Sequence, residues 1–264
     1  MIHAALEEPL LRERTIVVTG ASSGIGRAMA LAFAGHGAFV VNADVRPDPR
    51  EGGAPTDELI RAEGGDCLYL STDVSSAPQV ERLVETATAR HDRVDVFVNN
   101  AMFYGTHNGP LLYTREADWD AMMDVGLRGV FLCCRAVLRQ MLSQEPRAEL
   151  RGRIVNIASQ VAFLGSPGSF TSNTIKGAVV AMTRQLAVEF AEHGVAVNAI
   201  APGRIPTDDT DPPEVAEHAR LRAPYPRVGL PADVANLAVF LASDASTFMT
   251  GATVPVDGGW LATF

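Results

Sequence analysis

The stretch "TIVVTGASSGIGRAMALAF", Thr15 to Phe33, decides the fold of this 264-residue chain. Its first five residues are all β-branched, as in a buried strand, and its second half has the composition of a helix. Gly20, Gly24 and Gly26 stand between the two. Glycines permit a tight turn there, and the unpaired N–H groups that open a helix attract phosphate oxygens. The stretch therefore predicts a strand, a turn and a helix that together cradle the diphosphate of a dinucleotide.

Apolar runs like the first one recur along the chain and alternate with helical patterns. We expect strands at 15–19, 38–43, 67–71, 94–99, 152–158, 195–200 and 252–256. We expect helices at 24–36, 56–63, 76–90, 115–142, 172–192 and 231–242. This alternation predicts an α/β fold, a Rossmann-like doubly wound parallel sheet of about seven strands with helices on both faces. The strands are nearly all apolar, which is typical of strands buried on both faces.

No linker or repeat divides the chain, so we expect a single dinucleotide-binding domain over residues 1–264. Residues 46–56 are rich in Pro and Gly and predict a loop. Residues 202–227 carry many prolines and charges and are expected to form short helices over a site, as lid segments do.

Composition limits the partners of this protein. Hydrophobic residues make up 47% and the net charge is −9, which disfavours nucleic acid and anionic membrane surfaces. No signal peptide or membrane span is expected, so we predict a cytoplasmic protein. Cys67, Cys133 and Cys134 lack the spacing of a zinc or disulfide framework, and no metal site is predicted. The adjacent pair lies in an apolar helical run and is expected to be buried.

Several motifs in order give the chain a resemblance to a known family. They are "TGASSGIG" at 19–26, "DV" at 73–74, "NNA" at 99–101, Ser159, Lys176 and "PGRIPT" at 202–207. From Thr15 to about Gly259 the chain resembles the short-chain dehydrogenases/reductases. The resemblance implies hydride transfer between a nicotinamide cofactor and a small-molecule substrate. It also implies a homo-oligomer, dimer or tetramer, formed through helices 115–142 and 172–192.

The second strand favours NAD as the cofactor. Asp44 lies eighteen residues after Gly26, where a carboxylate can accept hydrogen bonds from the adenosine ribose and repel a 2′-phosphate. Ser22 and Ser23 offer no positive charge to such a phosphate, whereas the guanidinium of Arg46 could reach one. The cofactor-binding residues expected from the turn and the resemblance are Gly20, Ser22, Ser23, Gly24, Ile25, Gly26, Asp44, Asp73, Val74, Asn100, Ala101, Lys176, Pro202, Gly203 and Ile205.

The resemblance is less complete at the reaction end. Members of the family use a Tyr as proton donor, a Lys four residues later, a Ser that orients the substrate and an Asn that holds a relay water. Ser159 and Lys176 occupy the Ser and Lys positions, seventeen residues apart. Ser172 stands at the Tyr position, and no Tyr occurs between Tyr113 and Tyr225. The resemblance therefore assigns Ser159, Lys176 and Ser172 to the catalytic site.

Two further positions depart from the family. Gly126 stands where the relay Asn is expected, and Met102 replaces the Gly of "NNAG". An aliphatic hydroxyl is a far weaker acid than a phenol, and it is shorter. Loss of general acid–base help should slow carbonyl–alcohol interconversion by ~10²–10⁴-fold without preventing NAD binding. Substitutes are a water above Ser172, Lys176 itself as a base, or Tyr104 and His107 in the loop after the fourth strand.

Three functions remain open on these residues. The first is an NAD-dependent oxidoreductase with an atypical proton donor, whose catalysis is impaired or redirected. The second is a lyase, isomerase or cyclase on the same scaffold. The third is an NAD-binding homologue without catalysis.

Overall fold

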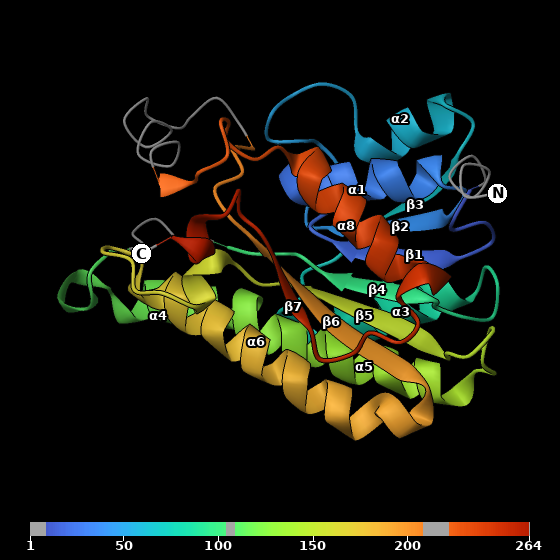
Figure 1. Cartoon of the computed structure of the whole chain (residues 1–264). Coiled ribbons are helices and arrows are strands. Elements are labelled where there is room, and N and C mark those ends of the chain that lie inside the picture. The colour runs from blue at the N-terminus through green and yellow to red at the C-terminus, as the bar shows by residue number, and fades with distance from the viewer. Residues whose placement is uncertain (1–8, 104–108, 208–221, 264) are drawn as a thin grey trace.

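The computed structural model describes residues 9–103, 109–207 and 222–263, and within them seven strands form one parallel sheet (Figure 1). Its order is β3-β2-β1-β4-β5-β6-β7. The strands are β1 Thr15–Thr19, β2 Phe39–Asp44, β3 Asp66–Ser71, β4 Val96–Asn99, β5 Gly152–Ile157, β6 Val195–Pro202 and β7 Thr253–Val256. The order reverses between β1 and β4, which is where open parallel sheets bind ligands. The predicted α/β fold class is confirmed.

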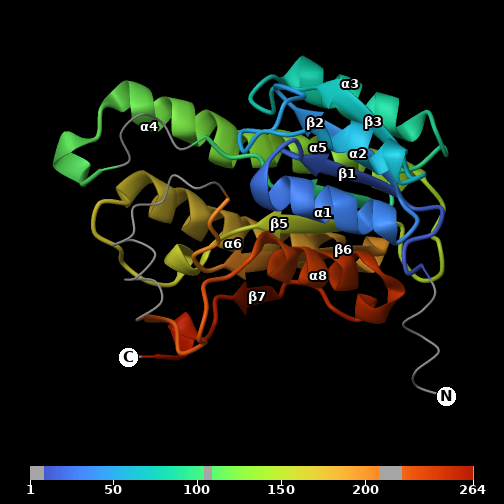
Figure 2. The same ribbon diagram turned by 90° about the horizontal axis from the view of Figure 1, so that it is seen from above.

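Helices cover both faces of the sheet (Figures 1 and 2). Those on one face are α1 Gly24–Gly35, α2 Thr56–Ala62 and α8 Pro231–Ala242. Those on the other face are α3 Ala77–Thr88, α4 Glu116–Met123, α5 Gly129–Ser143 and α6 Phe170–Phe190. Figures 1 and 2 both show α4 beside the start of α6, and the rings of Trp119 and Phe170 stack 5.6 Å apart there.

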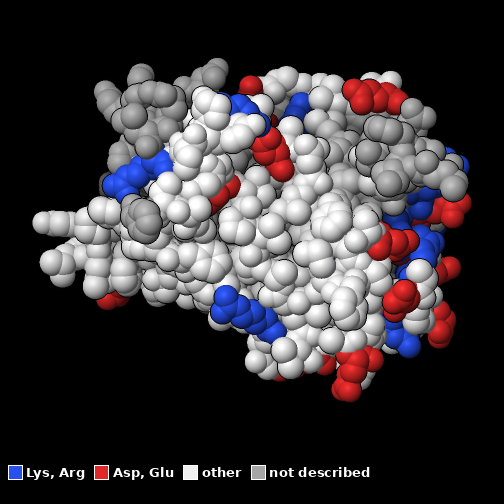
Figure 3. All heavy atoms as spheres, viewed as in Figure 1, with Lys and Arg blue, Asp and Glu red and all other residues white. Residues whose placement is uncertain are grey.

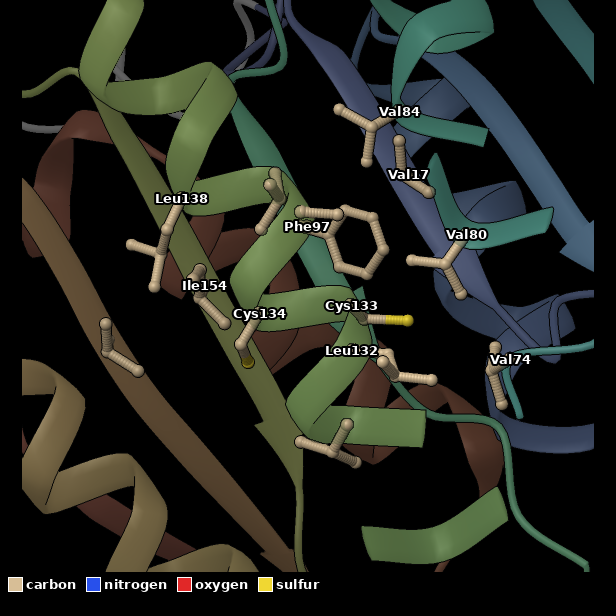
Figure 4. Close-up of a cluster of buried hydrophobic side chains, with 14 of the residues drawn as sticks. Val17, Val74, Val80, Val84, Phe97, Leu132, Cys133, Cys134, Leu138 and Ile154 are labelled. Carbon is tan, nitrogen blue, oxygen red and sulfur yellow. The ribbon is translucent and has the colours of Figure 1, made fainter. Parts of the chain in front are cut away.

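Each face of the sheet has its own hydrophobic core. Figure 4 shows the core under α5, with Phe97 of β4 packed among side chains of β1, α3 and α5. Cys133 and Cys134 lie within this core and are unpaired, so the prediction of buried thiols is confirmed. Burial also raises the pKa of both thiols. No helix within the described residues is long and apolar enough to cross a membrane.

Two predictions about the elements were wrong in detail. The outermost strands β3 and β7 are not buried on both faces, because each has a neighbour on one side only. The helix predicted over 115–142 keeps a helical backbone throughout but is not regular α-helix, because a π-helical turn, Asp124–Arg128, lies between α4 and α5. A π turn inserts one residue into the helical ladder and is frequent at functional sites.

Buried charges fasten the amino ends of the strands. Asp95, 1% exposed, accepts hydrogen bonds from Thr15 N at 2.9 Å and from Arg93 Nε at 2.7 Å. Both Asp244 oxygens accept from Arg14 Nη2, at 2.8 Å each. The charges tie β1 and β4 to the segment after α8, at the end of the sheet away from the glycine turn.

Candidate active site

The glycine turn after β1 has a backbone that other residues fit poorly. Gly20 and Gly24 have φ of +67° and +56°, in the left-handed region. A Cβ on Gly26 would lie 2.1 Å from the carbonyl oxygen of Gly20. Asn100 Nδ2 donates to the carbonyls of Thr19, at 2.8 Å, and Gly20, at 3.1 Å. The side chain after β4 therefore holds the turn after β1.

This turn forms one wall of a hollow of about 340 Å³ at the carboxyl ends of the strands. Many of the predicted cofactor residues line it, namely Gly20, Ser23, Gly24, Ile25, Gly26, Asp44, Asp73, Val74, Asn100 and Ala101. An open helix start, a glycine cradle and a carboxylate on one hollow fit a dinucleotide.

Asp44 and Ser22 are linked at the end of β2, on the side of the hollow where we expect the adenosine. Asp44 Oδ2 accepts a hydrogen bond from the backbone N of Ser22 at 3.1 Å. The Ser22 side chain is fully buried and turned inward, where its Oγ accepts from Asn42 Nδ2 at 3.1 Å. Ser22 therefore orients the carboxylate through its backbone, while its hydroxyl lies away from the hollow.

Sequence reasoning missed several residues at or behind this hollow, among them the four described next. Thr19 Oγ1 accepts from the backbone N of Asn100 and of Ala101, at 3.0 Å each. Thr207, Arg50 and Glu51 line the hollow itself. Thr207 lies in the quoted "PGRIPT" motif, so that motif could have indicated it as a site residue. Arg50 and Glu51 stand in a stretch predicted only as a loop.

Two of the predicted catalytic residues, Ser159 and Lys176, contact the segments at the ends of β5 and β6. Ser159 follows β5, and its Oγ lies 3.5 Å from the Pro202 carbonyl at the end of β6. Ser172 and Lys176 lie one turn apart near the start of α6, and both are buried. Lys176 Nζ donates to the carbonyl of Ile157 at 2.7 Å.

Burial changes the chemistry of Lys176. Removal from water lowers its pKa from 10.5 to about 8, because the charged ammonium loses its hydration. A lysine with this pKa is partly neutral near neutral to mildly basic pH, so it can accept a proton as well as hold one.

Met102 and Gly126 share one space. Gly126 lies in the π turn, and a Cβ on it would lie 2.7 Å from Met102 Sδ. The same Cβ would lie 3.0 Å from Cγ2 of Ile175, which neighbours Lys176 on α6. The thioether thus covers the position from which a longer side chain at 126 would project.

Three predicted cofactor residues, Pro202, Gly203 and Ile205, do not line this hollow. Pro202 ends β6, and a Cβ on Gly203 would meet Asp257 and Gln160. Ile205 lines a neighbouring hollow of about 380 Å³. Tyr104 and His107 lie outside the described residues, as does most of the expected lid segment, 208–221.

Comparison with known proteins adds to this geometry. A family profile described as "Enoyl-(Acyl carrier protein) reductase" matches residues 20–261. The chain is 40% identical to a 3-oxoacyl-[acyl-carrier-protein] reductase of Synechocystis sp. over 94% of this chain and 97% of the relative. It belongs to the short-chain dehydrogenase/reductase family.

Solved structures of this family match the whole fold. A short-chain alcohol dehydrogenase from Sinorhizobium meliloti, named as putative, superposes with a TM-score of 0.87 at 34% identity and covers 97% of this chain and 99% of its own. A gluconate 5-dehydrogenase from Beutenbergia cavernae, also named as putative, has a TM-score of 0.85 at 36% identity, with coverage of 97% and 99%. That structure holds NADP at low occupancy.

The chain is accordingly an oxidoreductase of the short-chain dehydrogenase/reductase type, a family whose members bind nicotinamide cofactors and act on small molecules. These comparisons do not favour the lyase, isomerase or cyclase alternative.

Proposed function

We propose that this family member transfers hydride between NAD(H) and a hydroxy or oxo compound, with a proton donor other than a tyrosine. The observation that supports the proposal is the pair Ser172 and Lys176, buried one turn apart on α6 with no phenol in the motif. When bound in the hollow, the nicotinamide would accept or supply the hydride.

The chain's own residues would handle the proton. Lys176 is held by the Ile157 carbonyl, and its lowered pKa lets it give or take a proton at Nζ. Ser159 Oγ would orient the substrate oxygen. Ser172 has a shorter side chain than Tyr, which leaves room for a water to carry the proton between Lys176 and that oxygen.

The preference for NAD rests on Asp44. Its carboxylate lines the hollow, fixed by Ser22 N, where it would accept from ribose hydroxyls and repel a 2′-phosphate. Arg46 and Arg50 also line the hollow, and their positive charges favour a 2′-phosphate. We expect NAD to bind more tightly than NADP, and Asp44→Ser to narrow or reverse the difference. Tighter binding of NADP to the wild type would overturn this preference.

The proton donor can be tested by restoring the family pattern. Because Met102 fills the space beside Gly126, the informative variant is Ser172→Tyr with Gly126→Asn and Met102→Gly. On a panel of secondary alcohols and ketones, we expect it to raise NAD-linked turnover by ~10²–10⁴-fold over the wild type. No gain, with dinucleotide binding retained, would mean that the pocket serves another reaction.

We also propose that the protein is a cytoplasmic homo-oligomer, a dimer or a tetramer. The face formed by α6, β7 and α8 carries few charged side chains over its centre (Figure 3). Exposed apolar side chains lie on α5, α6 and α8, among them Phe131, Val188 and Phe240. Contiguous exposed apolar surface marks protein interfaces, and we expect these side chains to be covered in the oligomer. Sedimentation equilibrium measures the state, and a monomer at micromolar concentration would contradict the proposal.

A further inference from the structure

The loop between β2 and α2 folds back over the glycine turn. The backbone N of Arg50 donates to Ser23 Oγ at 2.9 Å. Arg27 Nη2, from α1, donates to the carbonyl of Ala54 at 2.8 Å. These contacts hold the loop, residues 46–55, against the first turn of α1.

The loop brings a carboxylate to the start of that helix. Glu51 Oε1 accepts a hydrogen bond from the backbone N of Gly24, the first residue of α1, at 2.9 Å. The first turn of α1 contains no acidic residue of its own. The N–H groups at a helix start carry partial positive charge, so an anion is stabilised there. Glu51 supplies that anion from a different segment of the chain.

The same place is the phosphate cradle of the hollow. Gly20, Gly24 and Gly26 line it, and Glu51 lines it with them. A carboxylate and a phosphate oxygen cannot accept from one N–H at the same position, and two anions in contact repel each other. We propose that Glu51 occupies part of the cofactor's diphosphate position in the free protein and is displaced when a dinucleotide binds. The inference rests on the proposed function, because it requires that a dinucleotide bind here.

Glu51 then sets cofactor affinity. The Glu51–Gly24 contact is exposed, so breaking it has a modest cost. An anion at a helix start in such a position corresponds to a factor of about two to five in a binding constant. The factor should apply only to ligands that carry the diphosphate.

The experiment is calorimetric titration with NAD, NADP, ADP-ribose and adenosine at about 0.15 M salt. The proteins are the wild type, Glu51→Gln, Glu51→Ala and Asp48→Asn. Glu51→Gln keeps the shape and removes the charge, and Glu51→Ala also removes the acceptor. Asp48 is an exposed carboxylate of the same loop that does not line the hollow formed by the described residues, so Asp48→Asn is the matched control for charge.

We expect both Glu51 variants to bind NAD and ADP-ribose about two- to five-fold more tightly than the wild type. Adenosine affinity should not change, and Asp48→Asn should match the wild type for every ligand. Equal dinucleotide affinities in wild type and Glu51 variants would overturn the inference and leave the proposed function standing. A gain of similar size in Asp48→Asn would also overturn it, because net charge alone would then explain the effect. If neither NAD nor NADP bound to any of these proteins, the Glu51 inference and the proposed function would both be overturned.

Discussion

Gly126→Asn is the substitution for which the structure gives the clearest cost. The new Cβ would lie 2.7 Å from Met102 Sδ and 3.0 Å from Ile175 Cγ2. Met102 can turn aside because its side chain is flexible, but Ile175 is β-branched and fully buried. Overpacking costs about 1–3 kcal/mol, and a buried amide without a partner adds a similar amount. We expect the free energy of unfolding to fall by about 2–6 kcal/mol, which corresponds to a Tm about 5–25 °C lower.

Removing the thioether should relieve most of that cost. In Met102→Gly with Gly126→Asn, the amide enters the space that the methionine leaves, so the two effects should be non-additive by about 1–3 kcal/mol. Urea denaturation of the wild type, both single variants and the double variant measures this coupling. Gly177→Asn is the control, because a Cβ on this helical glycine meets no atom within 4 Å. Single costs that add to within about 0.5 kcal/mol would refute the shared space.

Three further outcomes are expected. Burial lowers the pKa of Lys176 from 10.5 to about 8, so between these pH values the unfolded chain binds more protons than the folded one. The free energy of unfolding of the wild type should therefore rise by about 1–3 kcal/mol from pH 8 to 10, as measured by urea titration. Lys176→Met should show a smaller rise. Asp95→Asn removes the carboxylate that Arg93 Nε contacts at 2.7 Å, while Arg14 keeps its bonds to Asp244. It should cost about 3 kcal/mol, seen as a lower urea midpoint, and a loss below about 1 kcal/mol would contradict the role of the buried charges. Gly26→Ala sets a Cβ 2.1 Å from the Gly20 carbonyl and should abolish dinucleotide binding in calorimetry, whereas Gly35→Ala, with no atom within 4 Å, should bind as the wild type does.

The sheet and its glycine turn could be predicted because their signals are local. β-branched runs, glycine spacing and the alternation of strand and helix each act over a few residues, and no end of a predicted strand differs from the observed one by more than two residues. The partial exposure of β3 and β7 could not be predicted from such local signals. Their apolar composition resembles that of the inner strands, and only the order of the sheet makes them edges.

The parts that could not be predicted depend on contacts between distant residues. Residues 46–56 were expected as a loop, but no local pattern indicates that Glu51 reaches the start of α1. The fit of Met102 against Gly126 joins positions 24 residues apart in the sequence. Met102 and Gly126 were each recognised in the sequence as departures from the family. That they compensate one another is a property of packing.

The buried charges around Asp95 lie at the amino ends of the strands, while the hollow lies at their carboxyl ends. Fold stability and chemistry thus draw on different residues of the same strands. Substitutions around Met102, Gly126 and Ser172 leave the Asp95 contacts untouched. Their cost in stability therefore stays confined to the carboxyl ends of the strands. This separation makes the carboxyl ends of the strands a region where new activities can be selected, in nature or in the laboratory, while contacts at the amino ends keep the chain folded.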